Sequence, residues 1–330
     1  QSARDEPQQA VFSGWCQLFD YFGSGSSVEL TVANSPIPPS EIGNRTFFDE
    51  GDAATAEYAR EYNKILNDKM REGISNLTRE RYLTFSTGAA SVDEAIPKLA
   101  RMRNDAEQTL AKIRSSSRRL NGRERLAAIN KLLRPGAPFV FDWEQVGALG
   151  SLTAKDFVCP NVLDFKPEGL GSCYKSDAEW CQVLSMHRFG SELTDRCLAE
   201  IIDLPIPLAI TIHAQPLDKA ASVAFVKRRI AWMDKEIIDE QMNAVKKGYD
   251  FQILPSELKY SKEEAEDLLD HLQNKNQRLY VYTGLVYTYA ASYETLQDRV
   301  MQIVSTARRN SIEIDALDFR QREGMNSILP

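Results

Sequence analysis

The chain has 330 residues, of which 43% are hydrophobic and 26% charged, as is typical of a globular protein with room for two domains. Its formal net charge of −7 opposes the general attraction that drives non-specific nucleic-acid binding, so we do not expect nucleic acid as the main partner. The five cysteines are odd in number and show no framework spacing, which predicts reduced thiols, and no apolar run approaches the length of a membrane span.

The first part of the chain, residues 10–135, predicts an α+β module. Hydrophobic periodicity predicts, in chain order, a helix over 10–22, a strand over 28–33, a helix over about 52–74 and a strand over 81–86. Ser91 with Glu94 three residues later makes a capping box, which starts a helix that continues to about Ser115. A short amphipathic helix within "LNGRERLAAINKLL" ends this module.

Residues 136–204 are interpreted as a connecting segment, because 135–175 are rich in glycine and proline. The spacing of Trp180, Val183 and Leu184 predicts a helix that packs by its apolar face. Four possible zinc ligands fall within 25 residues here, namely Cys173, Cys181, His187 and Cys197. The gaps between them match no zinc knuckle or ribbon, so we expect no metal site.

A second α+β module is predicted over residues 205–330. After a strand over 207–214, a helix over 217–247 would be about 45 Å long at 1.5 Å per residue. Ser261 and Glu264 make a second capping box, which predicts a helix that ends near 274 and folds back as an antiparallel arm, residues 217–274.

The first helix of this arm carries an apolar stripe, which predicts pairing with one neighbouring helix. Its members are Ala221, Ala224, Ala231, Ile238, Met242 and Val245. Arg228 and Lys235 fill the skipped heptad positions and are therefore candidate interface residues. The alternative is that Phe225 and Trp232 pack this helix on the sheet of its own module.

The order of elements then repeats that of the first module. Residues 279–287, "LYVYTGLVY", are apolar on both faces and predict a buried central strand. A helix over 292–309 and a strand over 312–317 follow. The predicted fold class is α+β, with two related, ferredoxin-like strand-helix-strand modules that superpose around strands 81–86 and 279–287. The alternative to duplication is chance recurrence of βαβ order.

No motif in the sequence predicts a catalytic or cofactor site. A phosphate-binding G-x-x-x-x-G-K-[ST] loop is absent, and "GSGSS" lacks the lysine and lies between a helix and a strand. His213, within an apolar strand, and His271, on an amphipathic helix, are interpreted as structural. The final segment "FRQREGMNSILP" either docks on the core through Ile328 and Leu329 or leads into further chain.

Several segments together resemble a known family. They are "ISNLTRERYLTFS", "LNGRERLAAINKLL", "AKDFVCPNVLDFK", "ELTDRCLAEIIDLPIPLAITIHAQPLDKA", "IIDEQMNAVKKGYDFQILPSELKYSKEEAEDLLDHLQNKNQRLY" and "REGMNSILP". In collinear order along nearly the whole chain, they resemble the N-terminal region of the conjugative-transfer ATPases of type IV secretion systems, the VirB-four or TraE-like class, in its Gram-positive form.

The resemblance implies a function for the chain. It implies a non-catalytic docking and assembly domain, cytoplasmic and peripheral to the membrane, that attaches a motor to channel subunits at the inner face of the membrane. It also implies self-association in the full-length protein, and ATP and Mg²⁺ in an ATPase domain after Pro330. No catalytic residue of the family falls on a position of this chain. The alternative is an independent cytosolic binding module for a peptide or RNA.

Overall fold

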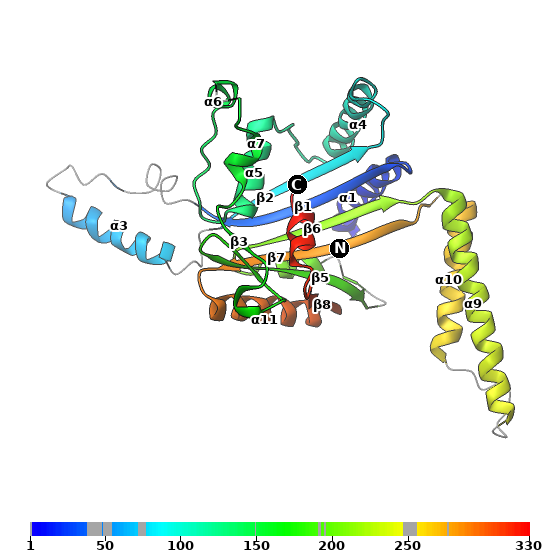
Figure 1. Ribbon diagram of the computed structural model, residues 1–330. Helices are drawn as coiled ribbons and strands as arrows, with labels where there is room; N and C mark the ends of the chain where they lie inside the picture. The colour runs from blue at the N-terminus through cyan, green and yellow to red at the C-terminus, as the bar shows by residue number, and fades with distance from the viewer. Residues whose placement is uncertain are drawn as a thin grey trace. The chain divides into compact units, whose positions relative to one another are not determined.

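The computed structural model describes residues 2–37, 48, 55–71, 77–148, 150–190, 193–194, 196–246, 256–275 and 277–330 (Figure 1). Its strands are β1 (Ser26–Pro36), β2 (Leu77–Thr87), β3 (Leu163–Asp164), β4 (Tyr174–Ser176), β5 (Glu179–Phe189), β6 (Leu208–Pro216), β7 (Tyr280–Ala290) and β8 (Ile312–Ala316). Its α-helices are α1 (Ser2–Tyr21), α3 (Ala56–Arg71), α4 (Val92–Lys112), α5 (Gly122–Leu133), α6 (Trp143–Ala148), α7 (Ala154–Val158), α8 (Cys197–Ile202), α9 (Lys219–Lys246), α10 (Ser256–Asn274), α11 (Tyr293–Arg309) and α12 (Gln321–Ser327).

The strands form one eight-stranded antiparallel sheet, and the predicted α+β class is confirmed. Its order is β2-β1-β6-β7-β5-β4-β3, with β8 also paired to β5. The predicted strand 279–287 overlaps β7 from Tyr280 onward, and β7 lies between β6 and β5; it is buried only from Gly284, because residues 281–283 are exposed. Residues 81–86 lie in β2, the first strand of the order. The two predicted modules therefore contribute strands to one shared sheet.

The strand order also has the symmetry that an internal repeat would produce. β1 and β6 are neighbours, and each pairs on its other side with the next long strand of its own half, β2 or β7. In each half a helical insertion, α3 or the pair α9 and α10, separates those two strands, and a helix follows them. The duplication itself stays a prediction.

By its contacts the chain divides into two compact units, each built from three segments. Unit 1 comprises Gln1–Val28, Phe85–Arg118 and Ala214–Tyr282, and unit 2 comprises Glu29–Thr84, Arg119–His213 and Thr283–Pro330. Both units include residues from both predicted modules. The boundaries 10–135, 136–204 and 205–330 stay a prediction, and the ends of the predicted helix 52–74, at 52–54 and 72–74, lie outside the described residues.

In unit 1, helix α1 is joined to the start of β7 by polar and aromatic contacts. The Tyr280 hydroxyl donates to the Phe19 carbonyl at 2.6 Å, and the Arg278 guanidinium donates to the Phe22 carbonyl at 2.7 Å. The Phe19 and Tyr280 rings meet edge to face with centroids 6.2 Å apart. Helix α4 starts as its sequence predicts, because the Ser91 hydroxyl accepts a hydrogen bond from the Glu94 amide.

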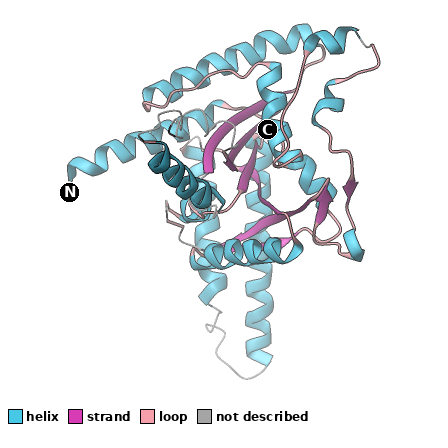
Figure 2. Ribbon diagram, turned by 90° about the vertical axis from the view of Figure 1, so that its left-hand side faces the viewer, coloured by secondary structure: helices cyan, strands magenta, loops and turns pink. Residues whose placement is uncertain are grey.

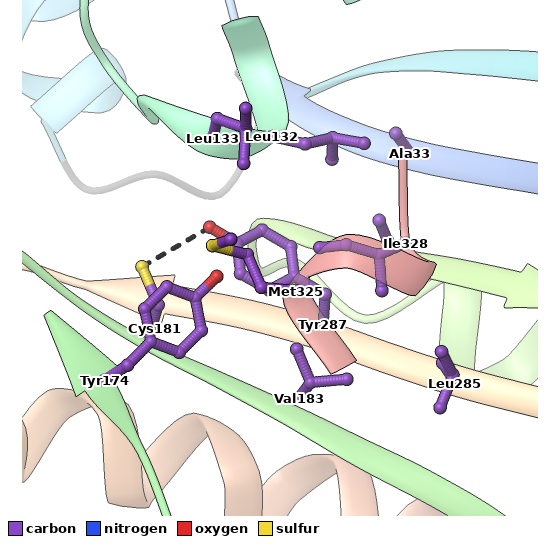
Figure 3. Packing of buried hydrophobic residues seen from close by; sticks show 11 residues of the cluster. Ala33, Leu132, Leu133, Tyr174, Cys181, Val183, Leu285, Tyr287, Met325 and Ile328 are labelled. Carbon is purple, nitrogen blue, oxygen red and sulfur yellow. Dashed lines mark hydrogen bonds between the residues drawn. The ribbon is translucent and has the colours of Figure 1, made fainter. Parts of the chain in front are cut away.

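Unit 2 has a hydrophobic core on each face of its part of the sheet. On one face α5 and α12 cover Val183, Ala209, Leu285 and Tyr287, and Figure 3 shows Met325 and Ile328 among them. On the other face α8 and α11 cover a cluster with Leu184, Met186, Ile210, Val286 and Ile314. Neighbouring residues of β5, β6 and β7 thus enter opposite cores, as the two-residue period of a strand requires.

The helix predicted around Trp180, Val183 and Leu184 is wrong, because these residues lie in strand β5. Residues 180–184 are all buried, so both faces of this strand carry packed side chains and its alternation is hidden in the sequence. β5 pairs with β7 along Trp180–Met186. The segment interpreted as a connection therefore supplies an inner strand of the sheet.

The C-terminal segment docks on unit 2, as one of the two alternatives for "FRQREGMNSILP" predicts. Ile328 has no exposed surface, and Leu329 packs against the same core cluster. The carbonyls of this segment also accept hydrogen bonds: Thr211 Oγ1 donates to Ile328 at 3.4 Å and Arg125 Nε to Pro330 at 3.2 Å. The further chain expected beyond Pro330 stays a prediction.

Gln321 of α12 completes the hydrogen bonding of β5 at a gap between two partner strands. On one edge, β5 pairs with β4 through residues 179–181 and with β8 through residues 184–189. Between them the Val183 amide donates to Gln321 Oε1 at 2.8 Å, and Gln321 Nε2 donates to the Val183 carbonyl at 2.9 Å. The side-chain amide thus replaces a missing strand at a buried position.

We expect Gln321→Leu to lower the free energy of unfolding by about 1 to 3 kcal/mol, because it keeps the side-chain volume but leaves the buried Val183 amide without its partner. Urea denaturation measures the change. Gln302→Leu, at an exposed position of α11, is the control and should change stability little. Equal effects of the two substitutions would show that the Gln321 amide is not needed for folding.

Glu29 is a half-buried carboxylate close to the C-terminal segment. Thr31 Oγ1 donates to it at 3.0 Å, and His213 Nδ1 lies 4.0 Å from its Oε2 atom. His213 Nε2 lies 2.6 Å from the Ser327 carbonyl, which agrees with the structural role predicted for this histidine. Burial raises the pKa of Glu29 above its ordinary value of 4.5, although His213, Thr31 and Arg125 act in the opposite direction.

The raised pKa of Glu29 predicts a pH-dependent contribution to stability. The folded protein binds the Glu29 proton more tightly than the unfolded chain, so this contribution is present below pH 4.5 and is lost as the pH rises through the raised pKa. We therefore expect Glu29→Gln to be more stable than wild type at neutral pH and equally stable at about pH 4. Urea denaturation at both pH values, with exposed Glu240→Gln as the control, measures the difference; a variant that is less stable at neutral pH would contradict it.

Candidate protein interface on helix α9

Helices α9 and α10 pack side by side as an antiparallel pair (Figures 1 and 2). Lys262 of α10 forms a salt bridge with Asp234 of α9, in which Nζ and Oδ1 lie 2.7 Å apart. The two helices confirm the antiparallel arm predicted over 217–274, and its connecting residues 247–255 lie outside the described residues. The capping box at Ser261 and Glu264 does not start the second helix, because α10 already begins at Ser256.

The inner seam of the pair has the three-and-four spacing of a coiled coil. On α9 its buried and half-buried members are Val223, Val226, Ile230, Met233 and Ile237, and on α10 they are Leu258, Lys262, Ala265, Leu269 and Leu272. Of these, Val226, Met233 and Leu272 are almost fully buried. This seam holds α9 against α10.

The apolar stripe predicted from the sequence is a different one, and it does not form this seam. Its members Ala221, Ala224, Ala231, Ile238, Met242 and Val245 are all exposed. The valines and isoleucines of the actual seam also recur at three-and-four spacing, so this seam could have been predicted from the sequence. The predicted stripe differs from the seam because it is built on alanines that lie on a neighbouring face of the same helix.

Two aromatic residues lie on the exposed side of α9, seven residues apart. Phe225 is 54% exposed and Trp232 is 50% exposed. The alternative that they pack α9 on its own sheet is therefore wrong. The guanidinium carbon of Arg229 lies 4.4 Å from the centroid of the Trp232 ring, a cation-π contact within the helix.

The two predicted interface residues share this exposed side. Arg228 and Lys235 are both exposed, and Arg228 Nε donates to the Ala224 carbonyl one turn earlier at 3.3 Å. The structure thus brings both predicted residues onto one face with Phe225 and Trp232, which the sequence analysis assigned to another contact.

The possible zinc ligands occupy separate places in unit 2. Cys181 is buried beside Tyr287, with Sγ 3.4 Å from the hydroxyl (Figure 3), and burial raises the pKa of its thiol to about 12. His187 Nε2 lies 3.4 Å from both Glu313 Oε2 and Asp315 Oδ2. Within the part of the chain that the structure describes, no group of three or more His, Cys, Asp or Glu side chains could hold a metal ion.

None of the helices among the described residues is both long and apolar enough to cross a membrane. A scan against protein-family models gave no match for this chain, and a search of curated proteins found no similar sequence.

A methionine-to-alanine substitution should cost different amounts of folding free energy in the inner seam and on the exposed face of α9. We expect Met233→Ala to lower the free energy of unfolding by about 2 to 4 kcal/mol, because Met233 is only 7% exposed. Met242→Ala is the matched control; Met242 is 52% exposed, so we expect a loss below about 0.5 kcal/mol in dilute protein. Urea denaturation measures both, and similar losses would contradict the assignment of the two faces.

Proposed function

We propose that the chain is the non-catalytic N-terminal docking and assembly domain of a type IV secretion ATPase, attached to channel subunits at the inner face of the membrane. The resemblance along nearly the whole chain is the basis for this family. In this proposal ATP and Mg²⁺ are bound by a P-loop domain that follows Pro330, and the present residues hold that motor in place.

The exposed face of α9 is the observation that carries the docking role. Its exposed apolar side chains include Phe225, Trp232 and Met242, and the same helix exposes charged residues, a combination typical of a site that another protein covers. Trp and Arg residues are also common energetic centres of protein interfaces, and Arg229 lies over the Trp232 ring here. The buried inner seam lets α9 present this face without losing its own packing.

The double substitution Arg228→Glu and Lys235→Glu tests the docking role. We expect the variant to unfold in urea like wild type, because both side chains are exposed. Its co-sedimentation with membranes that carry the channel subunits should fall at least about tenfold, since charge reversal at an interface replaces attraction by repulsion. Membranes from cells without the channel genes give the background.

A control with the same charge change is Lys227→Glu with Lys259→Glu, two exposed residues away from this face. Association that is unchanged in the first variant, or lost equally in the control, would contradict docking through α9. The proposal that the chain is part of a type IV secretion ATPase has a separate test in the coding sequence after Pro330. A strand and a G-x-x-x-x-G-K-[ST] loop are expected there, whereas an immediate stop codon would favour the independent binding module.

A further inference from the structure

The exposed side of α9 carries a second heptad pattern, here called the outer stripe. Its seven members follow one another at alternating spacings of four and three residues: Ala221, Phe225, Arg228, Trp232, Lys235, Asp239 and Met242. All seven are exposed in the structure. Such spacing brings side chains onto one line that a second helix can cover. Helix α10 packs against the inner seam, so it does not cover the outer stripe.

We propose that the outer stripe binds the outer stripe of a second copy of this chain in an antiparallel helix pair. In an antiparallel coiled coil the a and d positions of one helix face the d and a positions of the other. One register places Phe225 opposite Met242 of the second copy, Arg228 opposite Asp239, and Trp232 opposite Lys235. Because the pair is two-fold symmetric, each of these layers occurs twice.

The three layers are chemically complementary. Phe225 and Met242 make an apolar layer with a sulfur-aromatic contact. Arg228 and Asp239 make an ion pair. Lys235 reaches the ring of Trp232, on which Arg229 already lies in the free chain. The outer stripe thus supplies a partner of the right kind for six of its seven members, all except Ala221.

The positions beside the stripe fit the same register. On one side, Ala224 lies opposite Val245 of the second copy and Ala231 opposite Ile238, so two small residues meet two exposed apolar ones. On the other side, Arg229 lies opposite Glu236. Near the C-terminal end of α9, Met242 and Val245 are both exposed, so they are available to Phe225 and Ala224 of the second copy.

Charge along the helix selects the antiparallel direction. Residues 219–233 contain four basic residues and no acidic one, whereas residues 234–241 contain four acidic residues and one basic one. A parallel pair in register would place Arg228, Lys235 and Asp239 each opposite its own copy, which costs like-charge repulsion in three layers. The antiparallel pair sets the basic half of one helix against the acidic half of the other.

Charge exchange between Arg228 and Asp239 tests the pair in the full 330-residue chain. Sedimentation equilibrium should show a monomer-dimer equilibrium for wild type. Arg228→Asp and Asp239→Arg should each weaken it at least about 100-fold, because each places like charges opposite one another twice. An equimolar mixture of the two variants should dimerise again, since every contact then joins Arg to Asp. Lys227→Asp, adjacent in sequence but off the stripe, should have no effect.

The register has an independent test in disulfide formation. Ala231→Cys and Ile238→Cys face one another only across the antiparallel pair, so oxidation should cross-link their mixture and neither variant alone. Cross-linking of either variant with itself would overturn the proposal, because the antiparallel register separates the two copies of each cysteine by about two turns of helix. Wild type is the control for the native exposed thiols of Cys16 and Cys159. A monomeric wild-type chain whose outer stripe binds anionic lipid vesicles instead would also overturn it.

This inference names the partner for the assembly role proposed above, and a final variant separates the two. The double substitution Arg228→Asp with Asp239→Arg restores the complementary ion pair and should dimerise like wild type. If dimerisation is restored but binding to channel-bearing membranes is not, self-association stands, and the channel binds Arg228 in the monomer, where the outer stripe is uncovered. If the double variant stays monomeric and the two single variants also fail to dimerise in a mixture, the antiparallel register is wrong. This conclusion does not depend on the result of the membrane-binding assay.

Discussion

Strand β5 is the element on which the packing of unit 2 depends, because its side chains enter both hydrophobic cores. Val183 lies in the core under α5 and α12, and Leu184 in the core under α8 and α11. Its backbone is held by β7 on one edge and by β4, Gln321 and β8 in succession on the other. This arrangement couples α12, and with it the docked C-terminal segment, to the middle of the sheet.

The parts of the fold that could be predicted are those whose periodicity survives in the sequence. The helices α9 and α11 are long and amphipathic, and strand β7 is apolar on both faces between clear boundaries. β5 could not be recognised in the same way, because buried Gln182 interrupts its apolar run and disguises a two-faced strand. Gln182 reaches Gln297 of α11 at 3.4 Å, a tertiary contact that no local pattern reports.

The exposure of the candidate interface residues could be predicted in part for a related reason, and the interface itself stays a prediction. Arg228 and Lys235 were identified because they interrupt an apolar pattern, and both lie on the exposed face. The choice between the two sides of α9 required knowledge of where α10 packs. A helix with two heptad patterns offers two faces of equal periodicity for packing. The structure distinguishes them, because Met233 is buried and Trp232 is exposed.

The composition of the two stripes explains how one helix can serve two contacts. The inner seam is built from branched and long apolar residues, which suits a permanent pairing within one chain. The outer stripe mixes apolar and charged members, so it costs less to expose to water, and its charged layers discriminate between orientations of a partner. Polar layers in a helix pair commonly lower stability while fixing register. A surface of this kind suits reversible association, in which the separated chains must also remain folded.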